Sequence, residues 1–479
     1  MCRLTTDMKK RLNILDENQS AVKVIFLLAW PAILEQILLT AVNYVDTAMV
    51  GAIGTNATAS VGLVMSTIWL VNGFFAGISV GLSVPVGRAI GEGDLGKAKR
   101  VVKQSFLAVA ILGVSFAAAV ASLSPFIPSW LNGDAELIRG ATTYLAIIAA
   151  GYPFTLGMAV FSAILRCQGD TKTPLVFNIF TNLINVILNF LFIYPTREIA
   201  VFGKVFIMWG AGWGIAGAAS TTVAATAFSC VMLGLALMRK KDLGFTFKEK
   251  FHIEKDIWKE MLVLGSPVAL ERVTLNLGQV VITRLISGVG KISLAAHTLA
   301  LTAESITYMP GMGFSVAATT LSSQSLGAKK EKLAKKYTKY CVIGGMILMS
   351  LMGVVLYLFS YQLISVFTAD ETVRQLGSKL LKIESFPQAL FALSMVASGA
   401  LRGAGDTKWP FFIALAGMWL VRIPLAFILF KVTGLGVECA WYAMATDLAV
   451  RGIISFFRLR YGNWTNAYKK IKPQTPLKE

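Results

Sequence analysis

One polar decapeptide occurs twice in an otherwise apolar chain. LRCQGDTKTP at residues 165–174 returns as LRGAGDTKWP at residues 401–410, 236 positions later. Other polar landmarks keep the same offset: Pro31 with Pro267, and Glu35 with Glu271. Chance similarity between apolar segments rarely preserves several polar landmarks in one order. The chain therefore has to fold as two matching halves in the same orientation.

Apolar composition sets the class of the protein. Apolar residues make up 55% of the chain, charged residues only 15%, and the mean hydropathy is +0.65. About a quarter of the residues of an average soluble protein are charged. A helix that crosses a hydrocarbon core of about 30 Å needs roughly 20 apolar residues. We count twelve such stretches, six in each half, and predict an all-α polytopic membrane protein.

The expected architecture is two six-helix lobes. An even number of spans in each half needs no inversion, so a pseudo-two-fold axis along the membrane normal should relate the lobes. The predicted parts are an N-terminal segment, an N-lobe, a linker, a C-lobe and a C-terminal tail, at residues 1–20, 21–238, 239–259, 260–458 and 459–479.

The distribution of the basic residues behind the net charge of +19 indicates the membrane topology. Basic residues are frequent after the second, sixth and eighth spans, as in Arg88, Lys97, Arg239, Lys329 and Lys335, whereas the alternate loops hold few. Cytoplasmic loops carry an excess of Lys and Arg, which places both termini in the cytoplasm of a multi-pass plasma-membrane protein. The lipid bilayer is therefore the expected partner of this charge, and nucleic acid is not.

Residue types needed for enzyme or metal chemistry are sparse. The five cysteines are scattered singly without metal-ligand or redox spacing, and only two histidines are present. A membrane enzyme would need clustered His, Cys or carboxylates. We expect no catalytic residues, no cofactor and no metal beyond a possible Na+.

Asp46 is the foremost candidate functional residue, because an ionisable group inside a span is costly and needs a reason to be there. It lies in the first span, fifteen residues after Pro31, with no basic residue one helical turn away. Such a carboxylate can carry one proton or one Na+ through an access cycle. The alternative explanation is a hydrogen-bonded residue that serves packing alone.

Polar residues on later spans could complete the site. Asn182, Asn185 and Asn189 are three and four residues apart, which places them along one face of the fifth span. The sixth span adds hydroxyl groups at residues 220–222. These groups could coordinate Na+ or hold a protonated Asp46.

With PAILEQILLTAVNYVDTAMVG at residues 31–51 and VGRAIGEGDLGKAKR at residues 86–100, the chain resembles the multidrug and toxic compound extrusion (MATE) family. The resemblance covers about residues 20–460. It implies a V-shaped, twelve-helix exporter that moves small organic, often cationic, compounds outward against an inward flow of H+ or Na+. We expect it to act as a monomer.

The resemblance also favours one location for the coupling site. The N-lobe is similar to the DinF-like branch, whose fifth-span and sixth-span residues map onto Asn185, Asn189 and Thr222. Asn189 occupies the position at which this branch often has a second carboxylate, so the sequence differs from the branch there. The positions that resemble the C-lobe site of the NorM-like branch are Leu275 and Phe391, which cannot bind a cation. Coupling is therefore expected in the N-lobe.

Other intramembrane polar residues admit several roles. Pro31 could let the first span bend when Asp46 changes charge. Glu35 and Glu271 either organise water beside the prolines or, with Glu304, line the central cavity and attract cationic substrates. Asp447 and Arg451 are four apart and should form a helical ion pair. A lipid-linked saccharide flippase is the alternative function, with slight support from Arg272, Arg284 and Arg422.

Overall fold

The computed structural model describes residues 14–131, 133–201, 204–240, 243–245 and 252–470. Within these residues the N-lobe contains eight helices and one β-hairpin: α1 Ala21–Gly51, α2 Thr55–Glu92, α3 Leu95–Leu123, α4 Ile127–Trp130, α5 Ala135–Ala150, α6 Tyr152–Cys167, α7 Lys172–Phe192, β1 Pro195–Val201, β2 Lys204–Ala211 and α8 Gly214–Met238. The two strands pair antiparallel.

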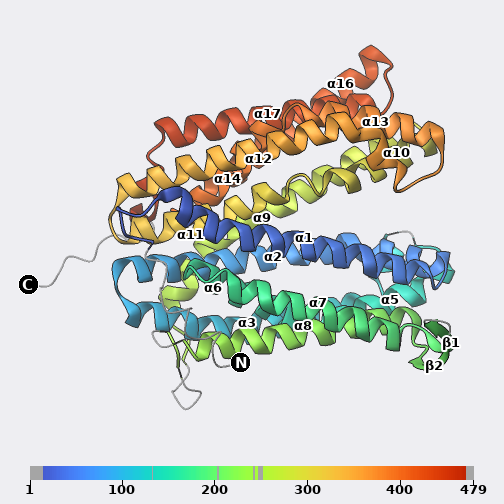
Figure 1. Ribbon diagram of the computed structural model, residues 1–479, viewed down its shortest axis with the longest axis horizontal. Coiled ribbons are helices and arrows are strands. Elements are labelled where there is room, and N and C mark those ends of the chain that lie inside the picture. The colour runs from blue at the N-terminus through green and yellow to red at the C-terminus, as the bar shows by residue number, and fades with distance from the viewer. Residues whose placement is uncertain (1–13, 132, 202–203, 241–242, 246–251, 471–479) are drawn as a thin grey trace, which may run out of the picture.

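The C-lobe repeats the order of the spans, with more of them broken, and its described residues contain no hairpin. Its helices are α9 Lys255–Ser287, α10 Lys291–Glu304, α11 Met309–Gly327, α12 Glu331–Ser365, α13 Glu371–Ser385, α14 Gln388–Gly403, α15 Lys408–Leu415, the π-helix η2 Ala416–Arg422, α16 Ile423–Thr433 and α17 Glu438–Tyr461. A short 3-10 helix, η3 Trp464–Lys470, follows. Figure 1 shows the two lobes as separate bundles of long helices.

The predicted twelve-helix fold is confirmed, although several spans are broken. In the described residues seven helices are long and apolar enough to cross a membrane, and two bent pairs, α5 with α6 and α13 with α14, bring nine. The bends are 49° and 60°. The remaining spans are α9, the pair α10 and α11, and α17. New helices begin beside Pro153, Pro310 and Pro387, since proline fits a first turn but cannot continue the preceding helix.

The predicted parts coincide only partly with these elements. Residues 1–13, several linker positions within 241–251, and residues 471–479 lie outside the described residues. The last five residues of the linker prediction already belong to α9, which begins at Lys255. Likewise, α17 continues to Tyr461, three residues into the predicted tail.

The two ends of the molecule differ. We call the end where α1 begins and α17 ends the terminal end, and the opposite end, which carries β1 and β2, the hairpin end. The lobes converge at the terminal end and diverge toward the hairpin end, which gives the molecule its V shape (Figure 1).

Each lobe receives the beginning of the other lobe's first helix. Val24 and Leu28 of α1 are buried in a cluster with Leu321 and Tyr337 of the C-lobe. Ile257 and Met261 of α9 are buried in the N-lobe core. Both helices therefore start in one lobe and continue in the other, and Pro31 and Pro267 lie just beyond the exchanged segments.

Glycine makes a close approach between α2 and α9 possible. A Cβ atom added to Gly77 of α2 would lie 2.6 Å from the carbonyl oxygen of Gly265 of α9. The reciprocal Cβ on Gly265 would lie 2.7 Å from the carbonyl oxygen of Gly77. Small residues of this kind allow membrane helices to pack backbone against backbone.

The duplicated decapeptide forms a short joint between two helices in both lobes. Gly169 and Gly405 have φ angles of +88° and +83°, a region that favours glycine. Asp170 caps α7, because its Oδ1 accepts the Thr173 N–H at 3.0 Å. Burial alone would raise the pKa of Asp170, but Lys240 at 2.5 Å and the Thr173 hydrogen bonds hold this pKa below its ordinary value.

The glycine contact gives a direct stability test. We expect Gly77→Ala to lower the apparent Tm in detergent by several degrees, because overpacking costs about 1–3 kcal/mol. Gly62→Ala on the same helix is the matched control, since a Cβ there meets nothing within 4 Å. Equal Tm values for the two variants would contradict the close contact.

Candidate functional site

The candidate coupling site lies between α1, α7 and α8 of the N-lobe. Asp46 is half-buried on α1, in the part of the helix nearer the hairpin end. The Nδ2 atom of Asn189 on α7 donates to Asp46 Oδ1 at 2.6 Å. None of the ion pairs found among the described residues includes Asp46. Its hydrogen-bonding partner is therefore an amide and not a cation.

A chain of hydrogen bonds leads away from this carboxylate. Asn189 Nδ2 also donates to Asn185 Oδ1 at 3.2 Å, and Asn185 Nδ2 donates to Thr222 Oγ1 at 3.4 Å. Asn185 and Asn189 are buried. The structure thus brings together the four residues named from the sequence for this site.

Thr221 is a member of the cluster that the sequence prediction did not single out. Its hydroxyl donates to Asn189 Oδ1. This contact fixes the amide so that its N–H group faces Asp46 and its oxygen faces away. The sequence places hydroxyl groups at residues 220–222, but spacing alone gives no means of choosing between neighbours on one helix. No hydrogen bond joins Asn182, on the same helix face, to Asp46 among the described residues.

Glu35 and Glu271 occupy equivalent buried ion pairs. Arg166 Nη1 donates to both carboxylate oxygens of Glu35 at 2.8 and 3.0 Å, and Arg402 Nη2 donates to Glu271 Oε1 at 2.6 Å. Asn178 Nδ2 adds a hydrogen bond to Glu35 at 2.6 Å. Each pair ties the first helix of a lobe to the arginine of that lobe's decapeptide.

Comparison with known proteins identifies the family. The MatE family model matches the chain twice, over residues 31–191 and 267–428. The chain belongs to the MatE family. Its members are transporters and not enzymes, which confirms the expectation that this protein is not an enzyme.

Relatives match this MatE protein over nearly its whole length. It is 28% identical over 449 residues to the probable multidrug resistance protein NorM of Thermotoga maritima, covering 92% of this chain and 93% of the relative. It is 25% identical over 444 residues to the probable multidrug resistance protein YoeA of Bacillus subtilis, covering 92% of each.

Solved structures confirm the MATE fold. A structure described as an outward-facing conformation of a multidrug resistance MATE family transporter of the MOP superfamily superposes with a TM-score of 0.87 at 21% identity, covering 96% of this chain and 99% of that chain. A crystal structure of MATE in complex with MaD3S gives 0.86 at 21% identity, covering 95% and 98%.

The C-lobe of this MatE protein does not repeat the Asp46 cluster. The positions that correspond to Asp46 and Asn189 are Ile282 and Leu425, and both pack in the apolar core of the C-lobe. The two lobes share a scaffold, but the polar cluster around Asp46 belongs to the N-lobe alone.

The C-lobe has polar groups of a different kind. Asp447 is fully buried and accepts from Arg451 at 2.6 Å, as predicted, and from Arg422 Nε at 2.8 Å. The bond to Arg422 was missed, because the two residues lie on different spans. Glu304 and Glu384 are also buried. Within the described residues neither carboxylate oxygen of Glu384 has a hydrogen-bond partner.

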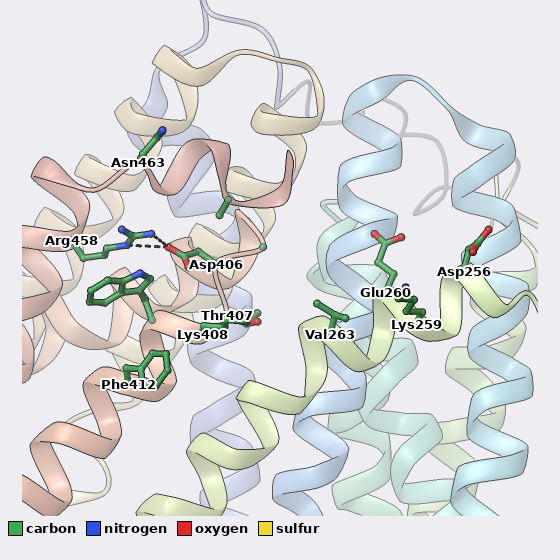
Figure 2. A pocket seen from close by; sticks show the side chains of 13 residues that line it. Asp256, Lys259, Glu260, Val263, Asp406, Thr407, Lys408, Phe412, Arg458 and Asn463 are labelled. Atoms are coloured by element: carbon green, nitrogen blue, oxygen red, sulfur yellow. Dashed lines mark hydrogen bonds and ion pairs between the residues drawn. The ribbon is translucent and has the colours of Figure 1, made fainter. Parts of the chain in front are cut away.

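A separate cavity of about 670 Å³ lies at the terminal end of the C-lobe. Figure 2 shows Asp256, Lys259 and Glu260 of α9 on one side of it, and Asp406 and Arg458 on the other. Arg458 Nε donates to Asp406 Oδ2 at 3.0 Å. None of the residues predicted for coupling lines this cavity.

The Glu271–Arg402 pair allows a double-mutant test. Removing one member of a buried ion pair costs about 3–5 kcal/mol, because the other charge stays buried without a partner. We therefore expect Arg402→Met to lower the apparent Tm strongly, and Glu271→Gln with Arg402→Met to recover most of the loss. Thermal unfolding of the purified protein in detergent measures both. If the double variant were as unstable as the single variant, the pair would not be the cause.

Proposed function

We propose that this protein exports small organic, often cationic, compounds across the plasma membrane in exchange for H+ or Na+, with Asp46 as the coupling carboxylate. Membership of the MatE family and the multidrug resistance names of its relatives support the substrate class. The observation that carries the coupling role is the Asn189–Asp46 hydrogen bond inside a polar cluster found in one lobe only.

The orientation of the protein follows from its charges. The basic stretches after the second and eighth spans lie at the terminal end, which we propose to face the cytoplasm. The lobes diverge toward the hairpin end (Figure 1). The structure would accordingly represent a state that is closed toward the cytoplasm.

The hydrogen-bond order favours H+ as the coupling ion. Asn185 Oδ1 and Asn189 Oδ1 already accept hydrogen bonds, from Asn189 and Thr221, and the group facing Asp46 is an N–H donor. This arrangement suits an ionised carboxylate. Na+ prefers oxygen ligands, and binding it would require Asn189 to turn. A proton on Asp46 would weaken the bond from Asn189 and so loosen α1 from α7.

Pro31 is the proposed hinge of this movement. The segment before it is packed in the C-lobe, and Asp46 after it is bonded to the N-lobe. The missing amide hydrogen bond at Pro31 gives α1 a place to bend when Asp46 changes charge. The carboxylates of Glu35, Glu271 and Glu304, proposed for the substrate cavity, are buried in the described state, so they would meet substrate only after the lobes move.

Dye efflux from vesicles tests the coupling role. We expect Asp46→Asn to abolish uphill efflux under imposed H+ and Na+ gradients alike, because the side chain can no longer change charge. Asn189→Ala should lower the rate by roughly tenfold, since a hydrogen bond to a charged group contributes about 1.5–3 kcal/mol. Asn182→Ala, an amide on the same helix outside the cluster, is the matched control.

The same assay distinguishes the remaining possibilities. Efflux that persists in Asp46→Asn, driven by either gradient, would remove Asp46 from the coupling role. Glu304→Gln and Glu384→Gln, tested in parallel, then report whether a C-lobe carboxylate carries the ion. Efflux by the wild type under an H+ gradient alone would support the proton, and a strict need for Na+ would reject it.

A further inference from the structure

The segment that precedes α1 is docked onto both lobes at the terminal end. Tyr337 of α12 donates its hydroxyl to the carbonyl oxygen of Ile14 at 2.8 Å, and Lys330 Nζ donates to the carbonyl oxygen of Leu15 at 2.9 Å. The Ile14 side chain is buried, and its Cδ1 lies 3.0 Å from the point where a Cβ on Gly169 would stand. This segment therefore joins α12 of the C-lobe to the decapeptide of the N-lobe.

The segment that follows α17 makes the converse connection. The guanidinium of Arg88 on α2 stacks over the ring of Tyr468, with 3.8 Å between Arg88 Cζ and the ring centroid. The Tyr468 hydroxyl donates a hydrogen bond to Glu260 on α9. Tyr468 also covers Gly405, where a Cβ would lie 2.8 Å from its Cδ2. The buried Trp464 packs with Leu326 and with three further C-lobe residues: Ala334, Leu401 and Ala404.

The two segments occupy equivalent places in the duplicated fold. Each segment covers the glycine of one decapeptide. A Cβ atom at Gly169 would be crowded by Ile14, and one at Gly405 would collide with Tyr468. Each also reaches an element of the opposite lobe: α12 for the N-terminal segment and α2 for the C-terminal segment. The Gly-Asp joint thus provides a docking position for a terminal segment.

We propose that residues 14–17 and 464–468 are a pair of clasps that hold the terminal end closed and must release one lobe before that end can open. The inference rests on the proposed function in requiring that the two ends open alternately and that the terminal end faces the cytoplasm. It does not depend on Asp46 or on the identity of the coupling ion.

Geometry indicates where the C-terminal clasp would release. Opening the terminal end separates the N-lobe, with α2 and the start of α9 that packs in its core, from α11 and the rest of the C-lobe. Because Trp464 anchors this clasp to the C-lobe, Tyr468 loses its contacts with both Arg88 and Glu260. Beside the clasp lies the polar cavity of Figure 2, lined by Asn463, Ala467 and Glu260. Water in that cavity can hydrate the groups that a displaced clasp exposes.

A native cysteine reports on opening. Cys167, the residue before the Gln-Gly-Asp joint of the N-lobe, is buried, and its carbonyl oxygen accepts from Gln324 Nε2 of α11 at 2.6 Å. Its Cβ lies 3.4 Å from the point where a Cβ on Gly87 of α2 would stand. Separation of the lobes at this end would expose the thiol.

The experiment measures how fast a maleimide labels Cys167. Cys2, Cys230, Cys341 and Cys439 are replaced by serine, and the reagent is added to inside-out vesicles. We expect Tyr468→Ala to label about fivefold faster than the parent, since loss of a cation–π contact and a hydrogen bond shifts the population toward the open state. Tyr337→Phe should give a smaller increase, because it removes only the hydrogen bond to Ile14.

Two controls keep the result interpretable. Tyr461→Ala changes an exposed tyrosine at the end of α17 and should label at the parent rate. If Tyr468→Ala does not yield a monodisperse protein, Arg88→Gln removes the same contact from the N-lobe side without altering the clasp. Labelling at the parent rate in both Arg88→Gln and Tyr337→Phe would overturn the proposal. The labelling rate is measured without an ion gradient. A failure of the clasp proposal is therefore distinguishable from a failure of the coupling role of Asp46, which is measured by efflux.

Discussion

The exchange of first helices between the lobes determines how this protein is held together. The start of α1 is part of the C-lobe core, and the start of α9 is part of the N-lobe core. Such an exchange requires α2 and α9 to touch through their backbones, which Gly77 and Gly265 permit. It also requires each helix to be fastened again to its own lobe, and the Glu35–Arg166 and Glu271–Arg402 pairs provide that attachment.

Symmetry of the scaffold and asymmetry of the chemistry have separate physical origins. The duplicated residues are those that shape the backbone or join helices, namely the prolines, the ion-paired glutamates and the Gly-Asp joints. Asp46 and Asn189 have apolar counterparts in the C-lobe, so a change of charge at Asp46 would have no matching event across the pseudo-two-fold axis. Glu304, Glu384 and Asp447 give the C-lobe its own buried carboxyl groups.

The sequence predicted what depends on local chemistry. Span length and the common face of Asn185 and Asn189 follow from composition and from helical periodicity. Partners far apart in the chain were not predictable, because nothing local marks them. Glu35 meets Arg166 across 131 residues, Asp447 meets Arg422 on another span, and Tyr468 meets Arg88 across both lobes. Those contacts arise only when the helices have packed.

The exchanged helices also bear on what half of this chain could do. A single six-helix unit would leave the apolar start of its first helix without the core that covers it, and its own core without the segment that fills it. Two such units would satisfy each other by trading first helices around a two-fold axis, which is domain swapping. The intact chain is equivalent to a swapped dimer whose subunits were joined end to end, and a separated half would be expected to assemble in pairs.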